Sequence, residues 1–243
     1  MQYFFKENGS GIKVMKIDIL TLFPEMFTGP LDHSIVKRAQ EKGKVEIKTH
    51  FLRRWTEDRH KTVDDRPFGG GVGLVLMVKP IFGALKDLKK KESKIILLSP
   101  QGKPFNQEKA SKLSKEKHLI FVCGRYEGID ERIREHLIDE EISLGDFILT
   151  GGEIPAMAIT DALVRLIPGV LEKQEAVQNE SFSRFKVEGK DRQLLEYPQY
   201  TRPAKFNNWS VPKILLSGNH QKIDTWRLKK ALQKTKKTRP DLL

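Results

Sequence analysis

Five short aliphatic runs alternate with charged, helix-like stretches, and this alternation limits the possible folds more than any other feature of the chain. Each run is rich in isoleucine, leucine or valine and is short enough to be a buried strand. The runs occupy residues 16–23, 45–51, 94–99, 118–123 and 142–149. Alternation of strands and helices is typical of an α/β domain, because parallel strands need a crossover that usually runs through a helix. The sequence therefore predicts a largely parallel, doubly wound sheet.

The stretches between these runs have the end signals of helices. The first begins with Pro24 and ends at Gly43, as proline favours a first turn and glycine a helix end. The predicted helical stretches are residues 24–43, 78–92, 106–117 and 130–139. Another helix is expected after the last aliphatic run.

Domain boundaries follow from where the alternation stops. The pattern ends near Leu171, so residues 15–171 are predicted to form the main domain. Residues 172–193 are polar without clear periodicity, which predicts a flexible linker. Residues 194–243 are predicted to form a small, basic, helical domain. Residues 1–14 lack the apolar core of a secretory signal and are interpreted as an N-terminal extension, with Met15 as an alternative start.

The net charge of +12 is concentrated near the C-terminus. From Gly218 onward, the chain has many lysines and arginines but only two acidic residues, Asp224 and Asp241. Such a segment favours a polyanionic partner, most simply nucleic acid. A solvated, lysine-rich helix of a heat-adapted protein explains the composition equally well.

The single cysteine, Cys123, excludes an internal disulfide and favours a reducing compartment, so we expect a cytoplasmic protein. We interpret Cys123 as a small buried residue at a strand end rather than as a nucleophile. The chain contains no apolar stretch of the length that a membrane helix needs, so no membrane association is expected.

Two adjacent glycines, Gly151 and Gly152, lie where the last aliphatic run passes into a helical pattern. A tight chain reversal would explain one such pair. However, three predicted strands end in short glycine-bearing loops, with the sequences SPQG, GRYEG and TGGEIP. In an open parallel sheet these loops share one edge, where ligands bind. Since glycine has no Cβ, the backbone can approach a flat polar ligand, and we predict a nucleotide-like small molecule there.

Several common sites are absent from the sequence. Neither a phosphate-binding G-x-x-x-x-G-K-[ST] loop nor a dinucleotide G-x-G-x-x-G motif follows the first strand. The glycine-rich residues 68–73 have no strand directly before them, and a flexible loop is the simpler interpretation. The six histidines show no close pairing with each other or with cysteine, so no metal site is predicted.

Seven motifs resemble one known family. They are LTLFPEMF, DRHKTVDDRPFGGGVG, SPQGKPFNQ, CGRYEGIDER, EISLGDFILTGGEIPAMAITDALVRLIPGVL, YPQYTRP and LLSGNH. In this order they resemble the bacterial tRNA (guanine-N1)-methyltransferases of the SPOUT class, from about Met15 to the end. The resemblance implies an α/β sheet with a deep C-terminal trefoil knot, followed by a small α-helical domain. General rules of chain topology would not predict a knot.

The resemblance also implies an activity. It is methyl transfer from S-adenosylmethionine to N1 of guanine at tRNA position 37, next to the anticodon. It further implies a homodimer with active sites at the subunit interface, and a dependence on Mg²⁺ for which no ligand can be chosen in this sequence.

The residues that match the family's cofactor site fall in the three glycine-bearing loops that the sheet-edge argument selects. They are Pro100, Gly102, Gly124, Tyr126, Glu127, Leu144, Gly145, Asp146, Phe147, Ile148, Leu149, Gly151, Gly152 and Pro155.

By the same resemblance, Glu180 is the general base that removes the N1 proton and Arg165 stabilises charge on O6. Members of the family usually have an aspartate at the position of Glu180. The segment after Glu180 is longer in this sequence than is usual in the family. Without the resemblance, Arg165 would be a snorkelling cation or a partner of Asp161, and Glu180 a solvated charge. Residues 64–66 are either guanine contacts or turn caps.

Two other functions remain open. A SPOUT-type methyltransferase acting on another RNA site would share the cofactor loops but would not need Glu180. A non-catalytic, basic RNA-binding protein would keep only the remnant of a cofactor cavity.

Overall fold

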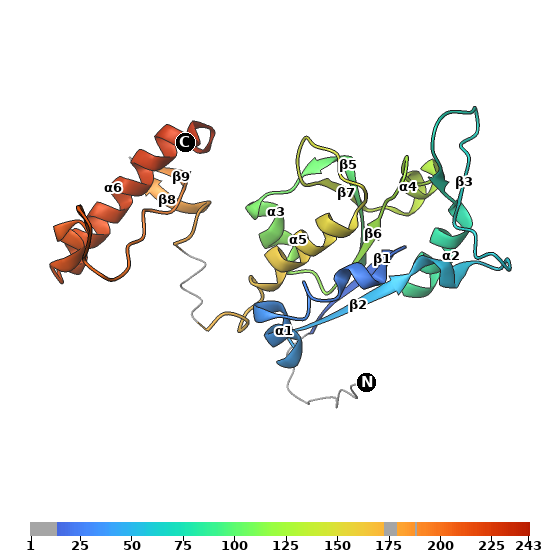
Figure 1. The fold of residues 1–243 in the computed structure, drawn as a ribbon, viewed down its shortest axis with the longest axis horizontal. Helices are drawn as coiled ribbons and strands as arrows, with labels where there is room; N and C mark the ends of the chain where they lie inside the picture. Colours follow the sequence, from blue (N-terminus) through green and yellow to red (C-terminus); the bar gives the residue numbers. More distant parts are fainter. Residues whose placement is uncertain (1–13, 173–178, 188) are drawn as a thin grey trace. The chain divides into compact units, whose positions relative to one another are not determined.

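The predicted aliphatic runs form one five-stranded sheet in the computed structural model, which describes residues 14–172, 179–187 and 189–243. The strands are β1 (Met15–Thr21), β2 (Val45–Phe51), β5 (Ser93–Pro104), β6 (His118–Cys123) and β7 (Glu140–Ser143). Their order is β2-β1-β6-β5-β7, and every pairing is parallel (Figure 1). The predicted α/β class with a largely parallel sheet is confirmed.

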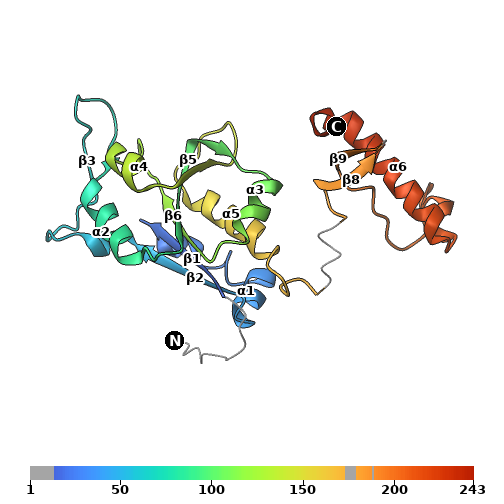
Figure 2. The same ribbon diagram turned by 180° about the vertical axis from the view of Figure 1, so that it is seen from behind.

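Helices cover both faces of the sheet, as Figures 1 and 2 show. On one face lie α1 (Ser34–Glu41), α3 (Gln107–Leu113) and α5 (Glu153–Val164); on the other lie α2 (Val78–Leu88) and α4 (Glu131–Leu137). The central strand β6 supplies both hydrophobic layers, because successive side chains point to opposite faces. Leu119 and Phe121 pack with the first group of helices, and Ile120 and Val122 pack with the second.

Short elements connect the sheet and its helices. They are η1 (Pro24–Phe27), η2 (Leu52–Trp55), β3 (Asp64–Asp65) and β4 (Val75–Leu76). Two predicted elements are shorter than expected. Gly29, with φ of +95°, interrupts the helix predicted at 24–43, so that stretch forms η1 and α1. The strand predicted at 142–149 ends at Ser143, because Gly145 has a φ of +154° that does not continue a strand.

A row of polar side chains crosses four neighbouring strands. The carboxylate of Asp18 accepts hydrogen bonds from Nε2 of His50 and Nε2 of His118, each at 2.6 Å. His118 Nδ1 lies 2.7 Å from Ser93 Oγ on β5. Burial opposes ionisation of Asp18, but the two histidine hydrogen bonds outweigh it and lower the pKa of its carboxyl group below the usual 3.8. The row therefore joins β2, β1, β6 and β5 through one ionised carboxylate.

The chain divides into two compact units, Met1–Glu172 and Lys173–Leu243, and this division falls beside the predicted boundary near Leu171. The described residues of the second unit form a long helix, two short 3-10 helices and two hairpins. Its elements are β8 (Ser183–Val187), β9 (Lys190–Leu194), β10 (Lys205–Phe206), β11 (Trp209–Ser210), η4 (Lys213–Leu216), α6 (His220–Thr238) and η5 (Pro240–Leu242).

The predicted linker at 172–193 differs from the structure. Its residues 173–178 lie outside the described residues, and 183–194 form the antiparallel β8–β9 hairpin rather than an irregular segment. Polar residues such as Ser183 and Arg192 share the more buried face of this hairpin with Phe185 and Leu194, so its apolar alternation is weak in the sequence. The hairpin joins α6 through Thr235, whose hydroxyl accepts a hydrogen bond from the Leu195 N–H at 2.9 Å.

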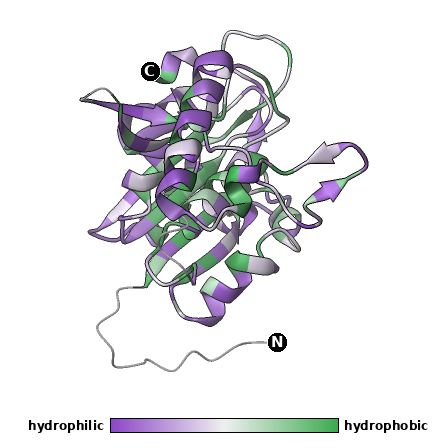
Figure 3. Cartoon of the chain, turned by 90° about the vertical axis from the view of Figure 1, so that its left-hand side faces the viewer, coloured by the Kyte–Doolittle hydropathy of each residue, from purple (hydrophilic) through white to green (hydrophobic). Residues whose placement is uncertain are grey.

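Hydropathy differs between the strands and the C-terminal helix. The sheet strands are largely hydrophobic in Figure 3, whereas much of α6 is hydrophilic. On α6 the buried residues are Ile223, Ala231 and Thr235. Within the described part of the chain, no helix combines the length and apolarity needed to cross a bilayer.

Candidate active site

Three loops at the carboxyl edge of the sheet surround one open cavity of about 250 Å³. The first loop is a bulge within β5, where Ile142 of β7 pairs with both Leu98 and Lys103, so the intervening residues leave the ladder with β7. The second loop follows β6 and the third follows β7. The structure thus brings together the three glycine-bearing segments that the sequence analysis selected.

Eleven of the fourteen predicted cofactor residues line this cavity. They are Pro100, Gly124, Tyr126, Glu127, Leu144, Gly145, Phe147, Ile148, Leu149, Gly151 and Pro155. Phe147 and Ile148 are 54% and 80% exposed, so they form apolar surface at the outer part of the site. An added Cβ at Gly124 would meet only the Leu98 carbonyl oxygen at 3.6 Å, so open space lies in front of this glycine.

The other three predicted residues, Gly102, Asp146 and Gly152, do not line the cavity. Asp146 is an exposed residue of the loop after β7. At Gly102 an added Cβ would lie 2.4 Å from the backbone nitrogen of Ile142, and at Gly152 it would lie 2.6 Å from Cα of Cys123. Both glycines are needed because another segment of this chain crosses there.

This crossing gives a second reason for the Gly151–Gly152 pair. The N–H of Gly152 donates to the Gly124 carbonyl at 2.9 Å, and Arg125 and Gly151 form an isolated antiparallel bridge. A Cβ at Gly151 would lie 2.4 Å from Nε of Arg125. The neighbouring loop of the protein itself therefore approaches both glycines, and Gly151 also lines the cavity.

A buried ion pair holds the two loops together. Glu153 is fully buried, and its carboxylate accepts hydrogen bonds from the Thr21 hydroxyl at 2.8 Å and from Arg125 Nε at 3.0 Å. Arg125 also donates to the Thr150 carbonyl at 3.2 Å and lies over the Phe23 ring, 4.5 Å from its centroid. A buried carboxylate requires such partners because its desolvation is costly.

Cys123 lies beside this ion pair. Burial, with the nearby Glu153 carboxylate, raises the pKa of its thiol well above the usual 9.0. A thiol that resists ionisation is a poor nucleophile. The position fits the interpretation of Cys123 as a buried strand-end residue.

Polar side chains that the sequence analysis missed also reach the cavity. Arg134 of α4 donates to Oε1 of Gln101 at 2.5 Å, and both residues line the cavity. A second guanidinium nitrogen lies 3.5 Å from Glu141, while the buried Nε of Arg134 has no hydrogen-bond partner among the described residues. Gln101, Arg125 and Glu153 lie in the glycine-bearing loops, and that position was the available signal. Arg134 lies within α4, so the loop pattern could not have indicated it.

The mouth of the cavity contains a strained tyrosine. Tyr126 has a φ of +57°, in the left-handed region that non-glycine residues seldom adopt, and it is 50% exposed. Burial of the phenol group, with the charge and hydrogen bond of Asp64, raises the pKa of Tyr126 above 10.0. Asp64 therefore lies near the site, whereas Asp65 accepts from the Arg66 N–H at 2.7 Å, as a turn-capping residue does.

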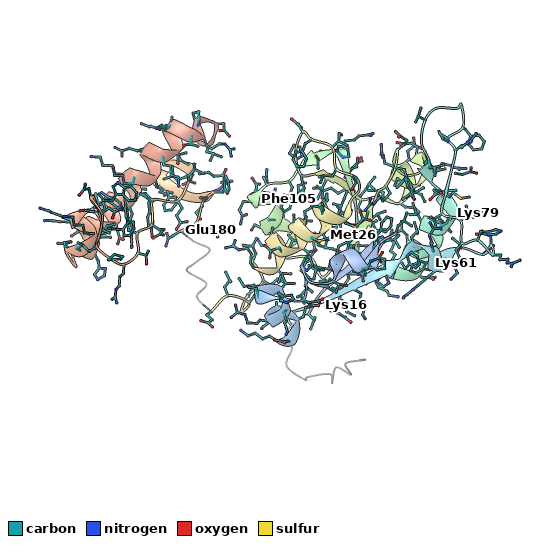
Figure 4. All side chains as sticks on the ribbon, in the orientation of Figure 1. Lys16, Met26, Lys61, Lys79, Phe105 and Glu180 are labelled. Atoms are coloured by element: carbon teal, nitrogen blue, oxygen red, sulfur yellow. The ribbon has the colours of Figure 1, made fainter. Side chains whose placement is uncertain are left out.

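The two predicted catalytic residues lie in different units. Arg165 follows the last residue of α5, and its N–H contacts the Asp161 carbonyl at 3.3 Å. Glu180, labelled in Figure 4, precedes the β8–β9 hairpin, and its carbonyl accepts from the Ser183 N–H at 3.1 Å. Neither residue lines the cavity. The structure of each unit by itself does not bring the two side chains together.

Acidic and histidine side chains form no metal-site cluster in the described ranges of the chain. The second unit is rich in cations instead. Lys229, Lys236 and Lys237 are exposed on α6. The sequence-predicted basic surface therefore exists on a long helix.

The comparison with known proteins covers nearly the whole chain. The family model described as tRNA (guanine-1)-methyltransferase TrmD matches residues 15–243. A tRNA (guanine-N(1)-)-methyltransferase of Dictyoglomus turgidum is 57% identical over 230 residues, which are 95% of this chain and 90% of that protein. The enzyme of the same name from Staphylococcus epidermidis is 56% identical over 230 residues, covering 94% and 91%. That from Carboxydothermus hydrogenoformans is 57% identical over 229 residues, covering 94% and 87%. Since the match extends through both units, the chain belongs to the tRNA (guanine-N1)-methyltransferase family.

Proposed function

We propose that this tRNA (guanine-N1)-methyltransferase binds S-adenosylmethionine in the cavity of the first unit and methylates the guanine at tRNA position 37. The observation that carries the proposal is the convergence of three loops on one cavity at the carboxyl edge of a parallel sheet. This edge is where α/β proteins bind nucleotide-like ligands. We place this reaction in the cytoplasm.

The residues around the cavity fit an S-adenosylmethionine molecule. Small-molecule sites are mostly apolar with a few polar groups, and occupy roughly 300–1,000 Å³. The cavity, of about 250 Å³, lies just below that range and is open on one side. Leu144, Leu149 and Pro155 offer an apolar surface for adenine. Gln101 and Glu127 are the polar groups that could bind hydroxyl and amino groups.

The chemistry divides between the bound molecule and this chain. S-adenosylmethionine supplies an electrophilic methyl group on a sulfonium ion. Guanine N1 loses its proton as it becomes the nucleophile, and a carboxylate is a suitable base, so we assign this role to Glu180. Negative charge then develops toward O6, and we assign its stabilisation to the guanidinium of Arg165. Both assignments rest on the resemblance to the family motifs.

Two structural features complete the proposal. We propose that the loops around the cavity form a trefoil knot, which the close crossings at Gly102 and Gly152 support. We also propose that the enzyme is a homodimer with its active sites at the subunit interface. Sedimentation of the purified protein tests the second of these directly, and a monomer at assay concentrations would contradict it.

The decisive experiment uses unmodified tRNA transcripts and labelled methyl donor. Transcripts with guanine at position 37 should be methylated, and matched transcripts with adenine there should not. Methylation of both would instead favour the alternative enzyme that acts on another RNA site. Calorimetric titration with S-adenosylmethionine separates either enzyme from a non-catalytic RNA-binding protein, which would give no binding heat.

Glu180 is tested by a pair of variants. Glu180→Gln should abolish methyl transfer, because the amide cannot accept the N1 proton, and should leave the affinity for S-adenosylmethionine unchanged. Glu180→Asp keeps the carboxylate and restores the residue usual at this family position, so it should retain activity. Unchanged turnover of Glu180→Gln would refute the assignment.

A further inference from the structure

The β10–β11 hairpin of the second unit leaves two large aromatic side chains uncovered. Phe206 is 59% exposed and Trp209 is 72% exposed. The two residues pair directly across the hairpin, and their ring centroids lie 6.0 Å apart with the planes inclined by 46°. Adjacent exposed aromatic rings are a typical feature of recognition surfaces.

The turn of the hairpin fixes the positions of both rings. Asn207 has a φ of +51°, a conformation that asparagine tolerates in tight two-residue turns. Since directly paired residues of a ladder point to the same side, Phe206 and Trp209 share one face. The rings therefore form a preformed aromatic surface of two tilted planes, which a ligand can contact at a small entropic cost.

The chain segment that carries this surface has basic residues and no acidic ones. Residues 197–223 contain no aspartate or glutamate. Within this segment Arg202, Lys205 and Lys213 are exposed, and none of the three has an ion-pair partner in the described ranges. Lys205 directly precedes Phe206 in the same strand, so its side chain leaves from the opposite face of the hairpin and reaches a ligand of the rings only around the strand edge. Exposed aromatic rings can stack on flat groups, and unpaired cations attract negative charge. Together they are complementary to an anionic polymer that carries flat groups.

We propose that Phe206 and Trp209 stack on an unpaired base of the RNA substrate while Arg202, Lys205 and Lys213 contact the adjoining phosphates. Single-stranded RNA is recognised by stacking on aromatic side chains, with cations following the backbone. A protein partner fits less well, because the centres of protein interfaces are depleted in lysine. A second copy of this chain would bring the same positive charge to the surface. The proposal rests on the proposed function only in taking RNA as the substrate.

The stacking part of the proposal is tested with two RNAs of equal length. One is an anticodon stem–loop with a single-stranded loop, and the other is fully paired. Trp209→Ala in the full-length protein should weaken binding of the stem–loop roughly tenfold, within the range measured for lost base stacking. Binding of the paired RNA should change less than twofold. Trp209→Phe keeps an aromatic ring and should retain most of the affinity.

The charge part is tested by salt dependence. Lys205→Gln and Lys213→Gln should each reduce the slope of log K against log salt by about 0.7–0.9, the change expected for one phosphate contact. Phe206→Ala should weaken binding by the same factor at every salt concentration. Calorimetry with S-adenosylmethionine should give wild-type affinity for every variant, since none of the altered residues lines the cavity.

Two results would overturn the proposal. An equal loss of affinity for the paired RNA would show that the rings do not recognise unpaired bases. Unchanged RNA binding by Trp209→Ala, with a lower sedimentation mass, would show that a second copy covers the hairpin. Because these assays measure binding without turnover, they are independent of whether guanine at position 37 is the methylated base.

Discussion

The cavity of the first unit and the basic surface of the second unit are constructed in opposite ways. The cavity depends on close backbone crossings and on a buried ion pair between Arg125 and Glu153. The surface depends on exposed side chains such as Lys229, Phe206 and Trp209. In the first case fold stability and ligand binding depend on the same residues. In the second case a side chain can be removed with little effect on folding.

The largest effect is expected at Glu153. Glu153→Leu leaves the Arg125 guanidinium, which is 15% exposed, without its carboxylate, so the variant should lose roughly 3–5 kcal/mol of unfolding free energy. Thermal and urea unfolding measure this loss. Glu153→Gln should be milder, because its amide oxygen still accepts a hydrogen bond. An unfolding midpoint within one degree of wild type would contradict the importance of the pair.

The next effect is expected at Gly152. Gly152→Ala places a methyl group 2.6 Å from Cα of Cys123, so we expect a loss of about 1–3 kcal/mol through backbone displacement. Affinity for S-adenosylmethionine should fall at the same time, because the displaced loop lines the cavity. Gly124→Ala is the matched control, since its Cβ meets only one oxygen at 3.6 Å and should leave stability unchanged. Equal stability losses in both variants would argue against the crossing.

An effect of similar size, but dependent on pH, is expected at Asp18. Its pKa is lowered in the folded protein, so its contribution to stability is complete above the usual value of 3.8 and is lost as the pH falls through the lowered value. Three groups act on this carboxylate: His50 and His118 hydrogen-bond to it, and the charge of Lys48 lies nearby. Asp18→Asn should cost about 1–3 kcal/mol at pH 7. Urea titrations should show the difference from wild type shrinking below about pH 4; a constant difference would exclude this linkage.

The smallest effect on stability is expected on α6. Lys229→Gln should change the unfolding free energy by less than about 0.5 kcal/mol. If Lys229 contacts a tRNA phosphate, the slope of log K against log salt should fall by about 0.7–0.9. Lys86→Gln, which alters an exposed lysine of α2, should leave that slope unchanged. A large loss of stability in Lys229→Gln would remove the contrast between the two units.

The sequence predicted those parts of the fold that have a strong local signal. The aliphatic run of β6 gave the strand His118–Cys123 with its observed ends, and the proline and apolar pattern gave α2. Glycines at strand ends located the loops around the cavity. The β8–β9 hairpin was missed because polar residues such as Ser183 and Arg192 also occupy its more buried face, which weakens the alternation that reveals a strand.

The partners of the site residues could not be predicted from local pattern. The carboxylate of Glu153 contacts Arg125 and Thr21, which are remote in sequence. Gly102 and Gly152 were assigned to ligand binding, but both accommodate another segment of the chain. The roles of Glu180 and Arg165 remain predictions from the family resemblance, because they depend on the assembled enzyme with its RNA.

The hydrogen bond between Thr21 and Glu153 spans 132 residues of sequence. During synthesis, this contact can therefore form only after nearly the entire first unit has emerged from the ribosome. Contacts of such long range are late and slow to form, because closing the loop between them costs chain entropy. A nascent chain that stops short of α5 lacks this contact, so the loops around the cavity can be held together only when the unit is complete.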